Sequence, residues 1–308
     1  MKVLVTGGAG FIGSHLVDGL IQAGDQAVVV DDLSSGSLRN LNRSAKFYQM
    51  DIGSPELKDL FEIEKPESVV HLAAQISVTR SVQDPLYDAR VNILGSLNLI
   101  SNCVNHKIAK LVYASSCAIY GPPQICPLDE TPEINPLSPY GVSKHTVEHY
   151  LATRYHLNGL SYVVLRYANV YGPRQNPFGE GGVVAIFSQQ MLSGKQPTIF
   201  GRGDKTRDYI YVSDVVRANM LALKSKVTGI FNVSTGLETP DQTIFDLVKK
   251  ECRYQGQPVY APERPGEIKR IFLSFQKAEK ALNWKPQINL KDGIARAVAF
   301  YREEPLNP

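Results

Sequence analysis

The sequence predicts an α/β fold with a parallel, doubly wound sheet and a smaller, discontinuous C-terminal domain. Short apolar runs alternate with longer amphipathic segments through the first half of the chain. These runs are apolar throughout, as expected for strands that helices cover on both faces. After residue 167 the alternation loosens, and prolines and glycines cluster. Right-handed crossovers between successive strands would then build a single parallel sheet.

The elements are expected in the following order. Strands are predicted at 2–6, 26–31, 46–49, 68–72, 110–115 and 160–166, and helices at 12–23, 55–64, 84–106 and 138–157. The last helix begins with Ser138 and Pro139, a typical N-cap followed by proline at the first helical position. We expect residues 1–167, with a strand near 230–233, to form the first domain. Residues 168–308 should form most of a substrate-binding domain.

Composition excludes several classes of protein. With 308 residues, 43% of them hydrophobic, the chain is too rich in core-forming side chains to be disordered. Its net charge of +3 is too balanced for binding nucleic acid or a membrane by electrostatics alone. No apolar run approaches the roughly 18–20 residues of a membrane span. The four cysteines lack metal-site spacing, and no signal peptide is expected at the start, so we expect free thiols and a cytoplasmic location.

A glycine-rich turn lies between the first strand and the first helix. Gly7, Gly10 and Gly13 have the spacing that lets backbone N–H groups approach a pyrophosphate at a helix N-terminus. The second strand ends at Asp31, 18 residues past Gly13, where a carboxylate can accept hydrogen bonds from a ribose. These features indicate a Rossmann-type dinucleotide site, and a structural glycine turn is the alternative. Because Asp31 would repel a 2′-phosphate, NAD is favoured over NADP.

A tyrosine and a lysine lie four residues apart at the start of the helix predicted at 138–157. This spacing places Tyr140 and Lys144 on one helix face. A cation about 4 Å from the phenol, at an effective dielectric of about 20, would contribute roughly 4 kcal/mol, or about three pKa units. We therefore expect Lys144 to lower the pKa of Tyr140 enough for proton transfer. Ser115 and Ser116 end the fifth strand, where they either bind substrate or cap a turn.

These motifs, in this order, resemble the extended short-chain dehydrogenase/reductase family and, within it, the nucleotide-sugar 4-epimerases. The resemblance covers essentially the whole chain. It rests on TGGAGFIGSH at 6–15, DDLSSG at 31–36, HLAAQ at 71–75, VN at 91–92, SSCAIYG at 115–121, YGVSK at 140–144, LRYANVYGPRQ at 165–175, RDYIYVSDV at 207–215 and RPGE at 264–267.

The resemblance implies roles for individual residues. The catalytic group would be Ser116, Tyr140 and Lys144. The NAD site would also include Gly7, Gly10, Phe11, Ile12, Gly13, Asp31, Asp32, Ser34, Ser35, Gly36, Asp51, Ile52, Leu72, Ala73, Ala74, Gln75, Asn92 and Tyr167. The nucleotide sugar would contact Ser116, Tyr140, Asn169, Gly182, Val183, Phe200, Arg207, Arg264 and Glu267. Arginines suit a diphosphate because guanidinium binds it bidentately.

The implied activity is an NAD-dependent 4-epimerisation that interconverts UDP-galactose and UDP-glucose through a transient 4-keto-hexose. Tyr140 would take the proton from the sugar O4. Related dehydratases carry an acid/base pair where this chain has Cys117 and Ala118, which disfavours dehydration. The alternatives are a UDP-N-acetylglucosamine 4-epimerase, another nucleotide-sugar reductase or dehydratase, and an NAD-sensing regulator without chemistry. The resemblance also implies a homodimer through the helices predicted at 84–106 and 138–157.

One pattern points to different chemistry. Residues 145–149 match HxxEH, a zinc peptidase signature in which His145 and His149 share a helix face. The segment follows Lys144 on the same helix, and no further ligand is identifiable by motif. We therefore expect no metal site. Cys117 is interpreted as a small filler beside Ser116 rather than a nucleophile, because no histidine base is evident beside it.

Overall fold

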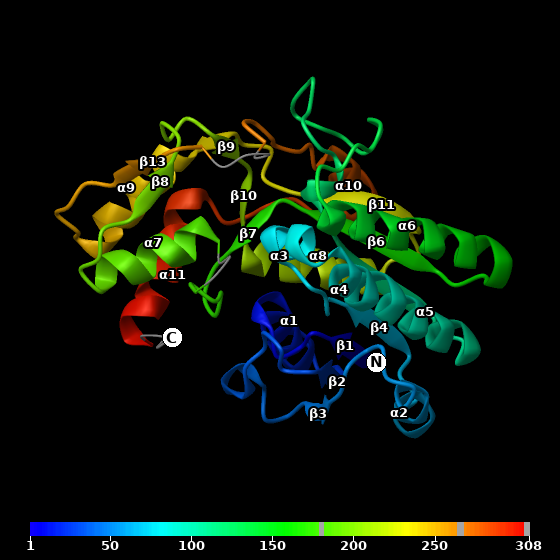
Figure 1. Cartoon of the computed structure of the whole chain (residues 1–308). Helices are drawn as coiled ribbons and strands as arrows, with labels where there is room; N and C mark the ends of the chain where they lie inside the picture. The colour runs from blue at the N-terminus through cyan, green and yellow to red at the C-terminus, as the bar shows by residue number, and fades with distance from the viewer. Residues whose placement is uncertain (179–181, 264–267, 305–308) are drawn as a thin grey trace.

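A single parallel sheet of seven strands organises the computed structural model, which describes residues 1–178, 182–263 and 268–304. The strand order is β11-β6-β5-β4-β1-β2-β3, so the chain starts in the sheet and winds outward in both directions (Figure 1). This confirms the predicted doubly wound α/β fold. The strands are β1 (Lys2–Thr6), β2 (Gln26–Asp31), β3 (Lys46–Gln49), β4 (Ser68–His71), β5 (Lys110–Ser116), β6 (Tyr162–Tyr167) and β11 (Gly229–Val233).

Helices cover both faces of the sheet and enclose two separate cores. One face carries α1 (Phe11–Gln22), α8 (Val212–Lys224) and α10 (Gln276–Leu282), which share one hydrophobic cluster. The other face carries α2 (Leu57–Glu64), α5 (Ser96–Asn105) and α6 (Pro139–Asn158), which share a second. Central strand residues such as Val3 and Leu4 are fully buried on opposite faces, which explains why these strands are apolar throughout.

The predicted helix at 84–106 is wrong as a single regular element. The chain instead forms α4 (Pro85–Ala89), a π-helix (Arg90–Gly95, η2) and then α5. A preceding helix, α3 (Val78–Gln83), is followed by Asp84, whose side chain caps the N-terminus of α4. A π-turn holds one more residue than an α-turn, and such turns are frequent at functional sites. Here the π-helix places the buried side chain of Asn92 toward α6, to which Asn92 is hydrogen-bonded.

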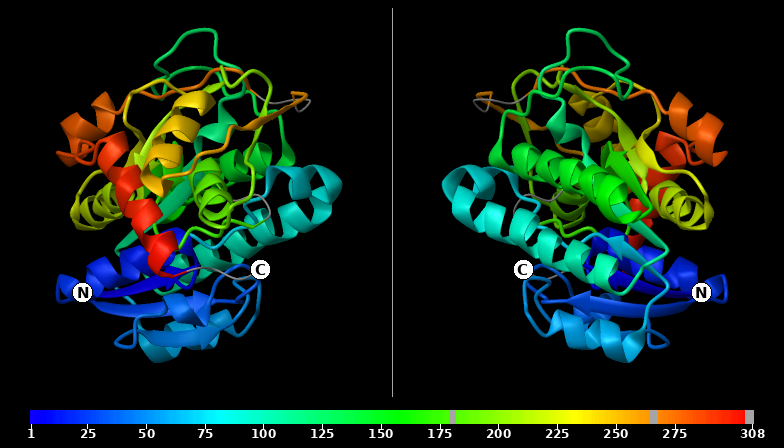
Figure 2. Two further views of the ribbon diagram at one scale, coloured as in Figure 1. Left: turned by 90° about the vertical axis from the view of Figure 1, so that its left-hand side faces the viewer. Right: turned by 90° about the vertical axis from the view of Figure 1, so that its right-hand side faces the viewer.

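The C-terminal half forms a second layer of elements beside the sheet. Its helices α7 (Val183–Leu192), α9 (Asp241–Cys252) and α11 (Leu290–Glu303) share a third hydrophobic cluster. These helices lie together on the left of Figure 1 and face the viewer in the left-hand view of Figure 2. Three small sheets pair β10 (Tyr209–Tyr211) with β7 (Asn169–Tyr171), β12 (Thr239–Pro240) with β9 (Thr206–Arg207), and β13 (Val259–Ala261) with β8 (Thr198–Phe200).

The chain passes between the two parts several times. β6 ends at Tyr167, and α8, β11 and α10 later return to the main sheet. The domain limits themselves stay predictions. Two short 3-10 helices, η1 (Leu38–Asn40) and η3 (Cys117–Ile119), follow β2 and β5.

Two further properties bear on the sequence-based expectations. Within the described residues, no helix combines the length and the apolar character needed to cross a membrane. All four cysteines are free. The cytoplasmic location stays a prediction.

Candidate active site

The glycine-rich turn joins β1 to α1 in a space that only glycine can occupy. Gly7 has a φ of +71°, and a Cβ there would lie 2.7 Å from the backbone nitrogen of Ala73. A Cβ on Gly13 would lie 2.0 Å from the Gly7 carbonyl oxygen. The turn is therefore closed around its own backbone and against the end of β4. The N–H groups of the turn lie next to the N-terminus of α1, and this arrangement favours the binding of an anion.

Asp31 lies against this turn, as the sequence predicts. Its buried carboxylate accepts hydrogen bonds from the N–H groups of Ala9 and Leu33, each at 2.9 Å. Burial raises the pKa of Asp31, whereas these backbone hydrogen bonds oppose the rise. Each carboxylate oxygen can accept more than one hydrogen bond, so Asp31 retains capacity for ribose hydroxyls. Gly36 also packs here, since a Cβ on it would meet Asp31 Oδ1 at 2.8 Å.

The remaining predicted cofactor residues lie in different surroundings. Asp32, Ser34, Ser35 and Asp51 are exposed, and Ile52 is buried in the second core. Phe11, Ile12, Leu72, Ala73 and Ala74 are partly exposed around the glycine turn and the end of β4. Gln75 and Asn92 are buried and hydrogen-bonded to each other in both directions. Tyr167 is also buried, and its hydroxyl pairs with Asn219 of α8.

The structure brings Ser116, Tyr140 and Lys144 together where α6 meets the carboxyl end of β5. Ser138 caps α6 by accepting the Gly141 N–H, and a hydrogen bond links the Ser116 and Tyr140 side chains. Lys144 is 4% exposed, and its Nζ donates to the Ala114 carbonyl at 3.0 Å. The same Nζ lies 5.9 Å from the centroid of the Tyr140 ring. A phenol, a hydroxyl and an ammonium group thus share one partly enclosed site.

The predicted lowering of the Tyr140 pKa by Lys144 is wrong for this structure. Burial raises the pKa of Tyr140 to about 12, although the hydrogen bond from Ser116 opposes the rise. Burial also lowers the pKa of Lys144 to about 8, against the charges of Asp88 and Glu148. The reason is that burial takes both functional groups out of water, and this effect is the largest cause of each shift. Loss of hydration disfavours the charged form of each group.

A buried ion pair supports the site from behind, and the sequence analysis did not find it. Glu148, one turn after Lys144, accepts two hydrogen bonds from the Arg166 guanidinium of β6, at 2.6 and 3.1 Å. It also accepts the hydroxyl of Ser115, the neighbour of Ser116. Arg166 Nη1 donates to Tyr120, whose hydroxyl donates to Asn232 of β11. Glu148 belongs to the HxxEH pattern, so the pattern drew attention to a functional residue for the wrong reason.

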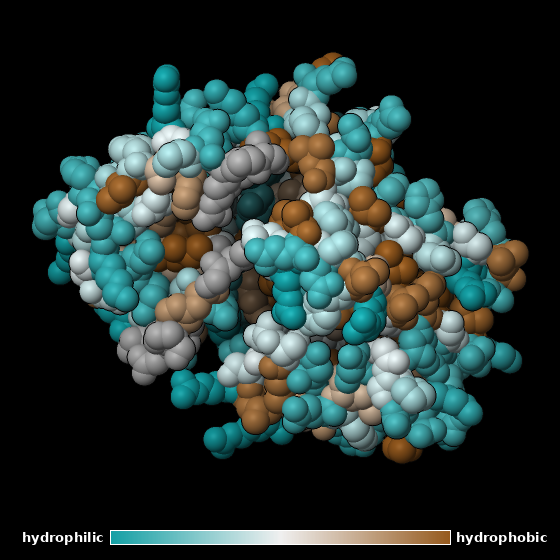
Figure 3. All heavy atoms as spheres, in the orientation of Figure 1, coloured by the Kyte–Doolittle hydropathy of each residue, from teal (hydrophilic) through white to brown (hydrophobic). Residues whose placement is uncertain are grey.

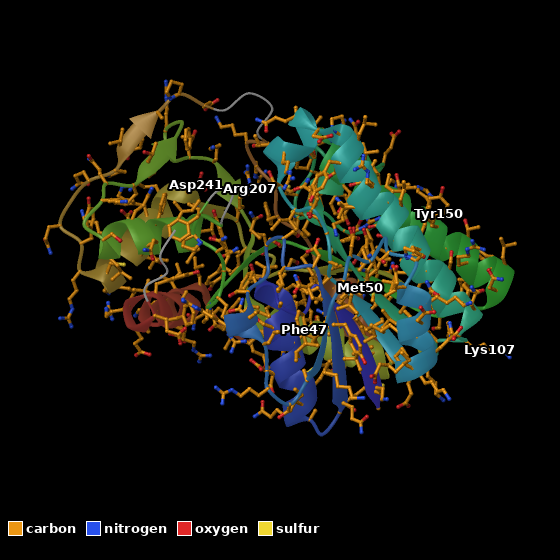
Figure 4. The ribbon with its side chains drawn as sticks, turned by 60° about the horizontal axis from the view of Figure 1, so that its bottom comes forward. Phe47, Met50, Lys107, Tyr150, Arg207 and Asp241 are labelled. Carbon is orange, nitrogen blue, oxygen red and sulfur yellow. The ribbon has the colours of Figure 1, made fainter. Side chains whose placement is uncertain are left out.

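The predicted substrate residues come from several C-terminal elements. Gly182 and Val183 begin α7, Phe200 ends β8, Asn169 is exposed on β7, and Arg207 ends β9. Arg264 and Glu267 lie outside the described residues. Figure 4 shows Arg207 beside Asp241, and Figure 3 shows the surface hollowed between the C-terminal part and the sheet. The positive charge of Arg207 acts on Cys117, which connects this strand with the end of β5.

The structure accounts for the HxxEH pattern at 145–149 and for Cys117 without metal or nucleophile chemistry. His145 and His149 contact each other through their Nε2 atoms at 3.0 Å, and His145 also contacts Glu148. Among the described residues, no group of three or more His, Cys, Asp or Glu side chains could hold a metal ion. Burial raises the pKa of Cys117 to about 11, which keeps it a neutral thiol.

Comparisons with known proteins agree on the kind of protein. Residues 3–234 match the NAD dependent epimerase/dehydratase family. A UDP-glucose 4-epimerase of Mycolicibacterium smegmatis is 42% identical over 99% of both chains. A crystal structure of the Thermotoga maritima UDP-glucose 4-epimerase with UDP-glucose is 47% identical, with a TM-score of 0.97 over 98% of this chain and 99% of that one. The Thermus thermophilus enzyme in complex with NAD is 42% identical, with a TM-score of 0.94 over 99% and 100%.

The Glu148–Arg166 pair should determine much of the stability. Glu148→Gln keeps the shape but leaves a buried guanidinium without its counter-charge, so we expect the free energy of unfolding in urea to fall by about 3–5 kcal/mol at pH 7. Burial by itself would raise the pKa of Glu148, but hydrogen bonds from His145, Arg166 and Ser115 leave it below the usual 4.5. Its stabilising effect is therefore present above pH 4.5 and is lost as the pH falls through the lower folded pKa.

The difference in unfolding free energy between Glu148→Gln and the wild type should accordingly become smaller below about pH 4.5. Glu62→Gln is the matched control, because Glu62 forms an exposed i,i+4 pair with Lys58. This change should cost no more than about 0.5 kcal/mol. An equal loss of unfolding free energy in the two variants at pH 7 would contradict the importance of the Glu148–Arg166 pair for stability.

Proposed function

Because the chain belongs to the NAD dependent epimerase/dehydratase family, we propose that it is an NAD-dependent 4-epimerase that interconverts UDP-galactose and UDP-glucose. The reaction passes through a transient 4-keto-hexose. The observation that carries this proposal is the hydrogen-bonded Ser116–Tyr140 pair beside the buried ammonium of Lys144. The relatives named UDP-glucose 4-epimerase match almost the full length of the chain, so the likeness includes the C-terminal part.

The residues around the glycine turn suit NAD. The turn brings backbone N–H groups and the α1 N-terminus to one point, where a pyrophosphate would bind. Asp31 offers carboxylate oxygens to a ribose beside it, and its negative charge would disfavour a 2′-phosphate. Bound NAD supplies a reversible hydride acceptor. Tyr140, Lys144 and Tyr167 would lie near its reacting end, at the carboxyl ends of β5 and β6.

The proton chemistry is carried by three side chains of this protein. Tyr140 takes the proton of the sugar 4-hydroxyl through its phenolate oxygen and returns it to O4 when the ring has turned to present its other face. Ser116 holds the same sugar oxygen and remains hydrogen-bonded to Tyr140. Lys144, with a pKa of about 8, stays mostly protonated at pH 7, and its positive charge, together with that of bound NAD, would offset the rise that burial causes in the Tyr140 pKa. Ala118 offers no acid or base for dehydration.

The C-terminal part would hold the nucleotide. Arg207 would bind the diphosphate, with Asn169 beside it, and Phe200, Gly182 and Val183 would contact the remainder of the UDP-sugar. Arg264 and Glu267 keep the roles that the family pattern implies, for the diphosphate and the uridine ribose. Because the substrate is anchored through its diphosphate, the hexose can turn within the site without leaving it.

A panel of nucleotide sugars tests the proposed activity. The purified protein with NAD should convert UDP-galactose to UDP-glucose and the reverse, with products separated by chromatography. Absorbance at the NADH wavelength should show no net change, because the hydride returns to the sugar. UDP-N-acetylglucosamine and UDP-N-acetylgalactosamine in parallel test the acetamido alternative. A stable keto sugar would indicate dehydration, steady consumption of NADH would indicate reduction, and either result would contradict the proposal.

Removal of one hydroxyl tests the role of Tyr140. Tyr140→Phe should lower kcat by about 10²–10⁴-fold, because the proton of O4 loses its acceptor. The melting temperature should change little, since the ring remains. Tyr155→Phe on the same helix is the control, because this tyrosine is 42% exposed and should leave kcat unchanged. Full activity of Tyr140→Phe would remove Tyr140 from the mechanism.

We also propose that the protein is a homodimer joined through the π-helix and α6. These two elements pack together, and α5 runs beside α6 in the right-hand view of Figure 2. Leu94, Val142 and Tyr150 are 61%, 49% and 39% exposed on them. Figure 3 shows hydrophobic side chains gathered on this side of the molecule. An apolar surface of this kind is typical of an interface between subunits.

Two charge substitutions test the dimer. Leu94→Glu combined with Tyr150→Glu should convert a particle with twice the mass of the chain into a single chain, as measured by light scattering. Ile63→Glu is the control, because Ile63 is 68% exposed on α2 and lies outside this surface. A wild-type protein with the mass of one chain at micromolar concentration would contradict the proposed dimer.

A further inference from the structure

A fully buried histidine lies between two hydroxyl groups behind the site. His71 ends β4, where Nδ1 lies 2.8 Å from Thr6 Oγ1 and Nε2 lies 2.8 Å from Ser96 Oγ. Burial and the charge of Lys144 lower the pKa of His71 to about 3. The imidazole is therefore neutral across the physiological range, with one nitrogen as donor and the other as acceptor. The chemistry described above does not use it.

The surrounding hydrogen bonds determine which nitrogen carries the proton. Ser96 donates its hydroxyl proton to the Asn92 carbonyl, four residues earlier on the same run of helix. A hydroxyl has one proton, so Ser96 Oγ must accept from His71 Nε2–H. His71 Nδ1 is then unprotonated and accepts from Thr6. This direction is consistent with Thr6 Oγ1 also accepting the Ala73 N–H at 3.2 Å.

This chain of hydrogen bonds runs from the glycine turn at one end to α6, the helix that carries Tyr140 and Lys144, at the other. Thr6 is the last residue of β1, directly before the glycine turn. At the other end, Asn92 lies in the π-helix, where its Nδ2 donates to Ser143 Oγ at 3.1 Å. Ser143 in turn donates to the Tyr140 carbonyl at 3.0 Å. The side chains that form these hydrogen bonds are buried, so water does not compete for the bonds.

We propose that His71 is a positioning residue for proton transfer. Its Nε2–H directs the Ser96 hydroxyl to the Asn92 carbonyl, and this bond holds the π-helix in the conformation that lets Asn92 orient α6. His71 thereby acts on Tyr140 and Lys144 without touching either the substrate or the cofactor. The inference rests on the proposed function, because kcat for the epimerisation is one of its readouts.

Two substitutions of His71 distinguish the roles of its two ring nitrogens. The amide of glutamine reaches the place of Nε2, whereas that of asparagine reaches the place of Nδ1. His71→Gln keeps a donor for Ser96 and should retain at least half of the wild-type kcat. His71→Asn keeps only the contact with Thr6 and should lower kcat for UDP-galactose about tenfold. The KM should stay within twofold for both variants, because neither changes a substrate contact.

Serine variants test the same bond with less risk to folding. Ser96→Ala should lower kcat about as much as His71→Asn, and the double variant should lose no more than either single one, since both remove one shared bond. Ser101→Ala is the matched control. Ser101 also donates to a carbonyl four residues earlier, that of Leu97 at 2.8 Å, but has no contact with His71. Its kcat should be unchanged.

Amide hydrogen exchange gives a readout that does not depend on activity. The Gln75 N–H donates to Asn92 Oδ1 at 2.8 Å, so its exchange reports the placement of the Asn92 side chain. We expect exchange at Gln75 to be at least tenfold faster in Ser96→Ala and His71→Asn, but unchanged in Ser101→Ala and His71→Gln.

The outcomes separate this inference from the proposed function. If the wild type fails to interconvert the sugars while Gln75 exchange responds as expected, the proposed function is wrong and the positioning of Asn92 stands. If the wild type is active but Ser96→Ala keeps full kcat and normal Gln75 exchange, the inference is overturned. Equal loss in Ser101→Ala, or a His71→Gln variant as slow as His71→Asn, overturns it as well. Should His71→Asn fail to fold, Ser96→Ala decides.

Discussion

The docking of α6 onto the carboxyl end of β5 is the contact on which the site depends. It takes the ammonium group of Lys144 out of water and gives it the Ala114 carbonyl as a partner. A buried charge without compensation is costly, so the surroundings of this group are constrained. Two buried carboxylates, Asp88 and Glu148, act on it from different elements. Because α6 is held in this way, Tyr140 meets Ser116 at the end of the neighbouring strand.

The same burial determines the protonation of the site. Loss of hydration raises the pKa of Tyr140 to about 12 and lowers that of Lys144 to about 8. Each shift favours the neutral form of its group, so the two pKa values, ordinarily 10.0 and 10.5, separate to about 12 and about 8. Enclosure therefore disfavours the phenolate form of Tyr140, and positive charge beside the phenol has to compensate for this during proton transfer. The fold produces both shifts chiefly through enclosure.

Sequence reasoning succeeded where the relevant information is local. The first three strands begin and end where the apolar runs predict, and the glycine turn lies between β1 and α1. The Tyr140–Lys144 spacing also places both residues correctly on α6, because helical periodicity alone puts them on one face. Local patterns could not reveal the π-helix at Arg90–Gly95, since its Asn92 is held by hydrogen bonds to Gln75, in the loop after β4, and to Ser143 of α6. Nor could they reveal that Glu148 pairs with Arg166.

The sequence by itself therefore determined the fold class, the family and the identity of the candidate catalytic residues. Each follows from residue type and spacing over short stretches of chain. Only the tertiary structure decided the sign of the Tyr140 pKa shift, the tautomer of His71 and the partner of Glu148. These depend on enclosure and on distances between strands and helices far apart in the chain, and spacing along the backbone does not contain either quantity.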